Sequence, residues 1–171
     1  MREYKELLRI PGALRLILTS LPPRTAYGMV GLGIFFKVEQ TTGSISFAGL
    51  ALGCNALSGS FTAGIRGSIM DKYGQKWPLR IMVPTYAALT IALNLADTKV
   101  AMLTLAFVMG LSAPPINLSV RPLWKIVVPE KDLRTAYAID SSIMNFAFVV
   151  GPVIATSLAL SRFSSSPLYI C

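Results

Sequence analysis

The stretch GSIMDKYGQK, from Gly67 to Lys76, is a charged, glycine-punctuated segment that separates two long apolar segments. The backbone of an irregular turn has no internal hydrogen-bond partners, so such a turn cannot lie in the hydrocarbon of a bilayer. We therefore expect this stretch to lie at a membrane surface, with the apolar segments on either side crossing the membrane.

The composition favours a membrane protein. The chain has 171 residues, of which 53% are hydrophobic and 14% charged, whereas soluble domains carry about 25% charged residues. The net charge of +8 does not indicate nucleic-acid binding, because the basic residues lie at the ends of apolar segments. The chain has no His, and its two cysteines, Cys54 and Cys171, are far apart. We expect no metal site, no disulfide framework, no cofactor and no enzymatic activity.

Five segments are long and apolar enough to cross a bilayer, which takes about 20 residues. The sequence therefore predicts an all-α polytopic membrane helix bundle with about five transmembrane helices. We expect a lead at residues 1–13, a bundle at residues 14–160 and a short polar tail at residues 161–171. The predicted spans run from Leu14 to Phe36, Ile45 to Ile65, Leu79 to Ala96, Val100 to Val120 and Tyr137 to Leu160.

The basic residues predict the orientation of the bundle. Most of the 16 Lys and Arg residues lie in the N-terminal lead and in the connections Arg66–Pro78 and Arg121–Ala136. The connections Lys37–Ser44 and Asp97–Lys99 carry few. Because cytoplasmic loops are rich in Lys and Arg, we expect a multi-pass protein of the cell membrane with a cytoplasmic N-terminus.

The spacing G-x-x-x-D-K-x-G-x-K in the stretch from Gly67 to Lys76 resembles the loop between the second and third helices of major facilitator superfamily (MFS) transporters. The stretch from Arg121 to Ser142 is similar to the connection between the fourth and fifth helices in a bacterial branch of that superfamily, and Thr41–Ser44 also fits that branch. The superfamily has two six-helix halves that rock about a central site. The resemblance implies that this chain is a truncated N-terminal half, without a sixth helix or a second half.

The resemblance also implies a cytoplasmic gate formed by Gly67, Asp71, Lys72, Gly74 and Lys76. Asp71 would hold a charge network that latches this gate in the outward-open state, with Arg121 or Arg134 as local partners. The alternative interpretation is a solvated polar loop that only follows the positive-inside rule.

Arg24 is the basic residue that lies well inside a predicted span, where a charge costs about 2.5–3.5 kcal/mol. One interpretation is that it faces a cavity and contacts an anionic substrate. In the other, Pro22 and Pro23 begin the helix, and Arg24 snorkels from near the interface. Asp140 is expected to cap or anchor the start of the fifth helix.

Other polar and helix-breaking residues also have two interpretations. Asn55, Asn117 and Asn145 are candidates for a substrate pathway or for interhelical hydrogen bonds. Pro114 and Pro115 predict a bend in the fourth span. Gly151 and Pro152 partly match an antiporter motif of the superfamily, and a packed kink between helices is the other interpretation. If Gly110 is the conserved glycine of the fourth helix, Ala106 and Met109 replace the Arg and Gln linked with proton coupling.

We expect secondary active transport of a small solute by alternating access, with the chain as an N-terminal part. The alternative is a non-transporting remnant, or a small membrane protein that acts by association with another membrane protein. A channel is less favoured, because the sequence lacks a filter-like motif. The expected partners are the lipid bilayer, a substrate of unknown identity, and a missing C-terminal half or another membrane chain; no nucleic acid is expected.

Overall fold

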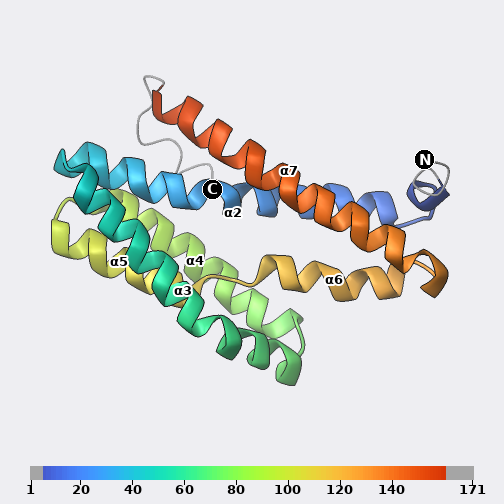
Figure 1. Ribbon diagram of the computed structural model, residues 1–171. Coiled ribbons are helices and arrows are strands. Elements are labelled where there is room, and N and C mark those ends of the chain that lie inside the picture. Colours follow the sequence, from blue (N-terminus) through green and yellow to red (C-terminus); the bar gives the residue numbers. More distant parts are fainter. Residues whose placement is uncertain (1–5, 161–171) are drawn as a thin grey trace.

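The computed structural model describes residues 6–160, and this part of the chain consists of helices and short connections (Figure 1). Residues 1–5 and the predicted polar tail at 161–171 lie outside the described residues. The elements are α2 (Ala13–Thr42), α3 (Ile45–Tyr73), α4 (Lys76–Leu95), α5 (Lys99–Ser112), α6 (Ile116–Val127), the 3-10 helix η1 (Glu130–Asp132) and α7 (Leu133–Leu160).

Four helical segments are long and apolar enough to cross a membrane: Ile45–Tyr73, Lys76–Leu95, Lys99–Val127 and Glu130–Ala159. The predicted all-α membrane bundle is confirmed. The first predicted span corresponds to α2, which has 30 residues but is not among these four. Arg24 and the two internal prolines lower its mean hydropathy.

The connection expected at Arg66–Pro78 is shorter than predicted. Helix α3 continues to Tyr73, and the chain reverses at Gly74 (φ +72°) and Gln75 before α4 begins at Lys76. Most of the stretch from Gly67 to Lys76 is therefore helical. A helix satisfies its own backbone groups, and 29 residues span about 43 Å, well beyond the ~30 Å hydrocarbon core. The polar end can therefore leave the membrane without unwinding.

The connection expected at Arg121–Ala136 is also shorter than predicted. Helix α6 continues to Val127 and α7 already begins at Leu133. Hydropathy underestimated the lengths of α6 and α7. Their polar and charged ends give no apolar signal, yet these ends contain no glycine that would end a helix.

The proline pairs act differently in two helices. Pro114 and Pro115 separate α5 from α6, as predicted: Ala113 leaves the helical region, and Pro115 precedes the first residue of α6. Pro22 and Pro23 lie inside α2, which runs past them without interruption. The prolines therefore do not begin that helix.

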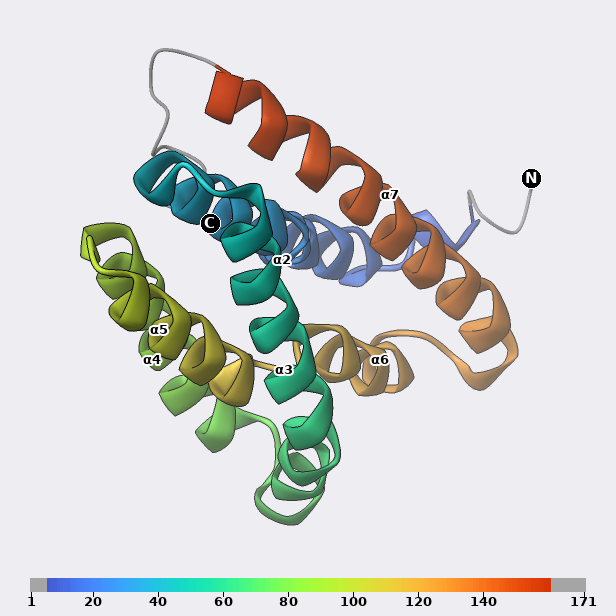
Figure 2. The same cartoon turned by 60° about the vertical axis from the view of Figure 1, so that its left-hand side comes forward.

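The most extensive helix contacts are between α2 and α7 and between α3 and α5, and α2 also packs on α3 (Figures 1 and 2). Glycine permits the closest approaches. A Cβ at Gly151 would lie 2.9 Å from the carbonyl oxygen of Thr25, and one at Gly110 would lie 2.2 Å from that of Asn55. Small residues at helix crossings are typical of membrane proteins.

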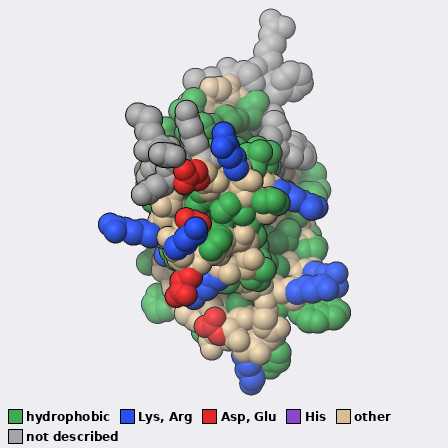
Figure 3. Space-filling model, turned by 90° about the vertical axis from the view of Figure 1, so that its right-hand side faces the viewer, with side chains coloured by type: hydrophobic (Ala, Val, Ile, Leu, Met, Phe, Trp, Pro, Cys, Tyr) green, Lys and Arg blue, Asp and Glu red, His purple; other side chains and the backbone are tan. Residues whose placement is uncertain are grey.

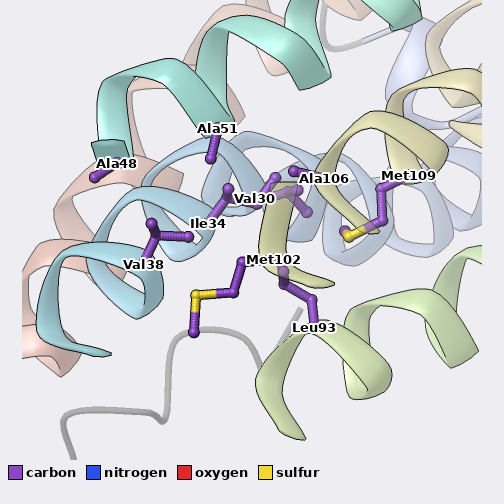
Figure 4. Close-up of a cluster of buried hydrophobic side chains, with 9 residues drawn as sticks. All are labelled: Val30, Ile34, Val38, Ala48, Ala51, Leu93, Met102, Ala106 and Met109. Carbon is purple, nitrogen blue, oxygen red and sulfur yellow. The ribbon is translucent and has the colours of Figure 1, made fainter. Parts of the chain in front are cut away.

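Two apolar clusters hold the bundle together. The larger joins α2, α3, α4 and α5 and contains Val30, Ile34, Val38, Ala48, Ala51, Leu93, Met102, Ala106 and Met109 (Figure 4). The smaller lies around α6 and contains Leu7, Ala13, Val120, Trp124, Val128 and Ala136. Since Leu7 is only 2% exposed, the described part of the N-terminal lead packs onto the bundle.

Candidate functional site

A cavity of about 500 Å³ lies between five helices, and we call it the five-helix cavity. Helices α2, α3, α4, α5 and α7 all contribute to its walls. Its volume lies within the range of small-molecule pockets, about 300–1,000 Å³. The lining residues are Tyr27, Gly28, Val30, Gly31, Asn55, Ala56, Gly59, Ser60, Ala63, Arg66, Tyr86, Gly110, Ala113 and Phe148.

Beside the cavity, a row of polar side chains on α3 donates hydrogen bonds to backbone carbonyls of α5, and Asn55 and Arg66 of this row also line the cavity. Asn55 Nδ2 donates to Ala106 O (2.9 Å), and Ser58 Oγ donates to Phe107 O (2.8 Å). One turn further on, Thr62 Oγ1 donates to Ser58 O of its own helix (2.9 Å) and lies 3.3 Å from Leu111 O of α5. The spacing of three or four residues places these donors on one face of the helix, so they fix α3 against α5.

Arg66 completes this row and is 8% exposed. Its Nη1 donates to the carbonyl oxygens of Gly110 (3.2 Å) and Ala113, and its Nη2 to that of Gly59 (2.6 Å). Nε donates to Thr62 O (3.3 Å). Because the last carbonyls of a helix lack intrahelical partners, the guanidinium stabilises the C-terminal end of α5 at the proline break.

Arg24 lies in a second buried polar cluster. Its Nη2 donates to Asp140 Oδ1 at 2.7 Å, and the exposed fractions of the two side chains are 1% and 3%. The indole Nε1 of Trp124 donates to the same oxygen at 3.1 Å. This cluster joins α2, α6 and α7. Arg24 therefore points into the bundle instead of snorkelling toward solvent, and Asp140 lies inside α7 rather than capping its start.

The residues of the predicted gate lie at the α3–α4 turn. Asp71, Lys72, Gly74 and Lys76 are exposed and Gly67 is half-buried. Asp71 and Arg121 line the same cavity of about 340 Å³ between α3 and α6. Among the described residues Asp71 has no ion pair: the two pairs found there are Arg24–Asp140 and Lys37–Asp97. Arg134 is exposed and does not line this cavity.

Charged side chains gather on the face of the molecule that holds the N-terminal end of α2 and the α6–α7 connection (Figure 3). The exposed basic residues of these segments and of the α3–α4 turn are Arg9, Arg15, Lys72, Lys76, Arg80, Arg121, Lys125, Lys131 and Arg134. The opposite end carries Lys37 and Lys99 among the described residues. The two ends of the bundle therefore differ strongly in basic charge.

The sequence model of the protein family Major Facilitator Superfamily matches residues 16–171. The chain belongs to the major facilitator superfamily. A curated relative, the uncharacterized MFS-type transporter y4rN of Sinorhizobium fredii, is 27% identical over 160 residues, which cover 91% of this chain and 40% of the relative. The chain thus spans less than half the length of that MFS relative. No solved structure gives a significant match.

The structure brings only one of the predicted pathway residues of this MFS chain to the five-helix cavity. Asn55 lines it, whereas Asn145 is exposed on α7 and Asn117 is half-buried at the start of α6. Gly151 packs against Thr25 and Gly28 of α2, and Pro152 is accommodated within α7. In residues 6–160, no group of three or more His, Cys, Asp or Glu side chains could hold a metal ion.

Sequence reasoning missed Ser58, Thr62 and Arg66. A signal was present: together with Asn55 they recur every three or four residues along an otherwise apolar helix. Arg66 was assigned to a connection because it follows the apolar run. The pairing of Arg24 with Asp140, 116 residues apart, has no local signal at all.

Proposed function

We propose that this chain forms the N-terminal part of a secondary active transporter that moves a small solute by alternating access. The observation that carries the proposal is the five-helix cavity, which combines apolar walls with Asn55, Ser60 and Arg66. Family membership supports transport over catalysis. In the superfamily's architecture, a second half would close such a cavity, and the bundle at residues 14–160 would be most of one half.

The predicted gate fits this proposal. Asp71 and Arg121 face one cavity from different helices without an ion pair within 4.0 Å. A small movement of α3 toward α6 would bring opposite charges together at the end of the bundle that we propose is cytoplasmic. Gly74, with φ +72°, gives α4 a tight reversal that most other side chains would strain.

The experiment uses Ser60→Cys, in a background where Cys54 and Cys171 are replaced by Ser. The protein is expressed as the cell makes it, and a membrane-impermeant maleimide is added to right-side-out and to inverted vesicles. Alternating access predicts that Cys at position 60 reacts from both sides. Reaction from one side only contradicts alternating access.

The gate is tested in the same vesicles with Asp71→Asn, and with Asp71→Glu as the charge-preserving control. If Asp71 latches the outward-open state, Asp71→Asn increases the labelling rate from the cytoplasmic side and Asp71→Glu leaves it near the original rate. Equal rates in all three proteins would argue for a solvated polar turn without a gating role.

A further inference from the structure

The five-helix cavity carries one formal charge on its lining, and that charge is positive. Arg66 is the basic residue of the lining, and none of the lining residues is Asp or Glu. The nearest acid along the helix, Asp71, lines a different cavity. Within residues 6–160, Arg66 forms no ion pair with a carboxylate. Among the described residues, only carbonyl dipoles offset the charge of its guanidinium.

One N–H group of the Arg66 guanidinium does not take part in the hydrogen bonds described above. A guanidinium has five N–H groups, and four of them donate to Thr62, Gly110, Ala113 and Gly59. The fifth, on Nη2, has no acceptor in the described part of the chain. Carbonyl dipoles at the end of a helix amount to about half a negative charge, so a net positive potential remains at the cavity wall.

The remaining walls determine what else a ligand needs. The rings of Tyr27, Tyr86 and Phe148 and the small residues of α2 and α3 make most of the lining apolar. Pockets of this kind orient a ligand through a few polar groups and bury the rest of it against apolar surface. A buried guanidinium beside such a surface suits an anion with an apolar body, because charge-assisted hydrogen bonds strengthen away from water.

We propose that the solute bound in the five-helix cavity is a small organic anion with an apolar body, and that Arg66 is the residue that selects its charge. This inference rests on the proposed transport function. It assigns to Arg66 the role that the sequence suggested for Arg24. The difference is that Asp140 neutralises Arg24 at 2.7 Å, whereas no carboxylate in the described part of the chain neutralises Arg66.

The test measures charge preference at the cavity wall. Purified protein carrying Ser60→Cys, with Cys54 and Cys171 replaced by Ser, reacts with a sulfonate-bearing and with a trimethylammonium-bearing methanethiosulfonate. Ser60 follows Gly59, whose carbonyl accepts from Arg66. Thr41→Cys, exposed at the far end of α2, is the reference. We expect the sulfonate-to-ammonium rate ratio to be at least about fivefold higher at position 60 than at position 41.

Two variants of Arg66 identify the source of that preference. Arg66→Gln removes the charge and should abolish the excess ratio, while Arg66→Lys keeps the charge and should retain most of it. An equal ratio at positions 60 and 41 in the parent protein overturns the proposal, and so does an excess ratio that survives in a folded Arg66→Gln protein. The parent comparison decides the matter even if Arg66→Gln fails to fold.

Protection by matched probes tests binding. Benzoate should slow the reaction of Cys at position 60 with neutral N-ethylmaleimide, whereas benzyltrimethylammonium, of similar size and opposite charge, should not. Equal protection by both probes contradicts an anion site. These rates are measured in detergent and do not depend on the side of the membrane from which a reagent arrives. The anion site can therefore be contradicted while alternating access is supported, and alternating access can be contradicted while the anion site is supported.

Discussion

At the scale of single residues, the described part of the chain contains two ion pairs in very different surroundings. Arg24 and Asp140 form a pair whose side chains are 1% and 3% exposed, and Trp124 donates to the same carboxylate. Lys37 and Asp97 meet at 4.0 Å, with side chains 12% and 86% exposed. Losing one partner of a buried pair leaves an uncompensated charge, whereas a pair at 4.0 Å with one partner in solvent contributes little.

We therefore predict that Asp140→Asn lowers the free energy of unfolding by about 3 kcal/mol. The double variant Arg24→Gln with Asp140→Asn should lose less than the sum of the two single variants, because neither charge is then stranded. Asp97→Asn is the control and should cost less than about 1 kcal/mol. Denaturant unfolding in detergent gives all four values, and additive losses would show that the two side chains do not interact.

A second prediction concerns the polar row on α3. Ser58→Ala removes the hydrogen bond to Phe107 O and should cost about 0.6–1.7 kcal/mol, the range for interhelical hydrogen bonds in membranes. Ser60 is the matched control, because its hydroxyl bonds only within α3, to Ala56 O. Ser60→Ala should stay within about 0.5 kcal/mol of the parent. A larger loss at position 60 than at 58 would remove the support for this row.

At the scale of helices, close approach is the property that sequence patterns describe least well. All glycines of α3 read alike in the sequence. A Cβ at Gly59 would nevertheless lie 3.5 Å from Gly110 O of α5, whereas a Cβ at Gly64 would meet nothing within 4 Å. In α5, Gly110 lies directly against the backbone of Asn55. Which glycine lies at a crossing depends on how two helices are rotated about their own axes. The sequence of one helix does not specify that rotation.

This contrast gives a third prediction. A Cβ at Gly110 would lie 2.0 Å from Ser58 Oγ and 2.2 Å from Asn55 O, so Gly110→Ala must separate α3 and α5 and should cost about 1–3 kcal/mol. Gly64→Ala should be neutral or slightly stabilising, since Ala is the better helix former. Thermal unfolding of the two variants in the same detergent compares them. Equal midpoints would mean that the crossing can relax without cost.

The extent of the helices was predictable from the sequence only where the helices are apolar. Hydropathy located all five apolar segments, and the proline pair located the break at Pro114. It missed the last eight residues of α3, because charged residues such as Asp71 and Lys72 lower hydropathy without ending a helix; the end comes only at Gly74. The candidate site was harder to predict, since Asn55 and Tyr86 lie on different helices and only the packing brings them to one cavity.

At the scale of the whole molecule, the fold separates two kinds of polar group. Several polar side chains inside the bundle are hydrogen-bonded to neighbouring helices, as in the row on α3 and in the Arg24 cluster. Most of the exposed basic side chains gather at one end. The first group fixes the helices around the five-helix cavity, and the second provides the charge asymmetry that orients a membrane protein during insertion.

That asymmetry yields the last prediction. If the basic end is cytoplasmic, Lys72→Cys should react with a membrane-impermeant maleimide in inverted vesicles and resist it in right-side-out vesicles, and Thr41→Cys should show the opposite pattern. Both positions are exposed. Lys72 lies at the C-terminal end of α3, and Thr41 lies at the C-terminal end of α2, close to the start of α3. A 29-residue α3, about 43 Å long, places them on different sides of the ~30 Å core. Labelling of both from one side would contradict the bundle's crossing of the membrane, and a reversed pattern would place the predicted gate outside the cell.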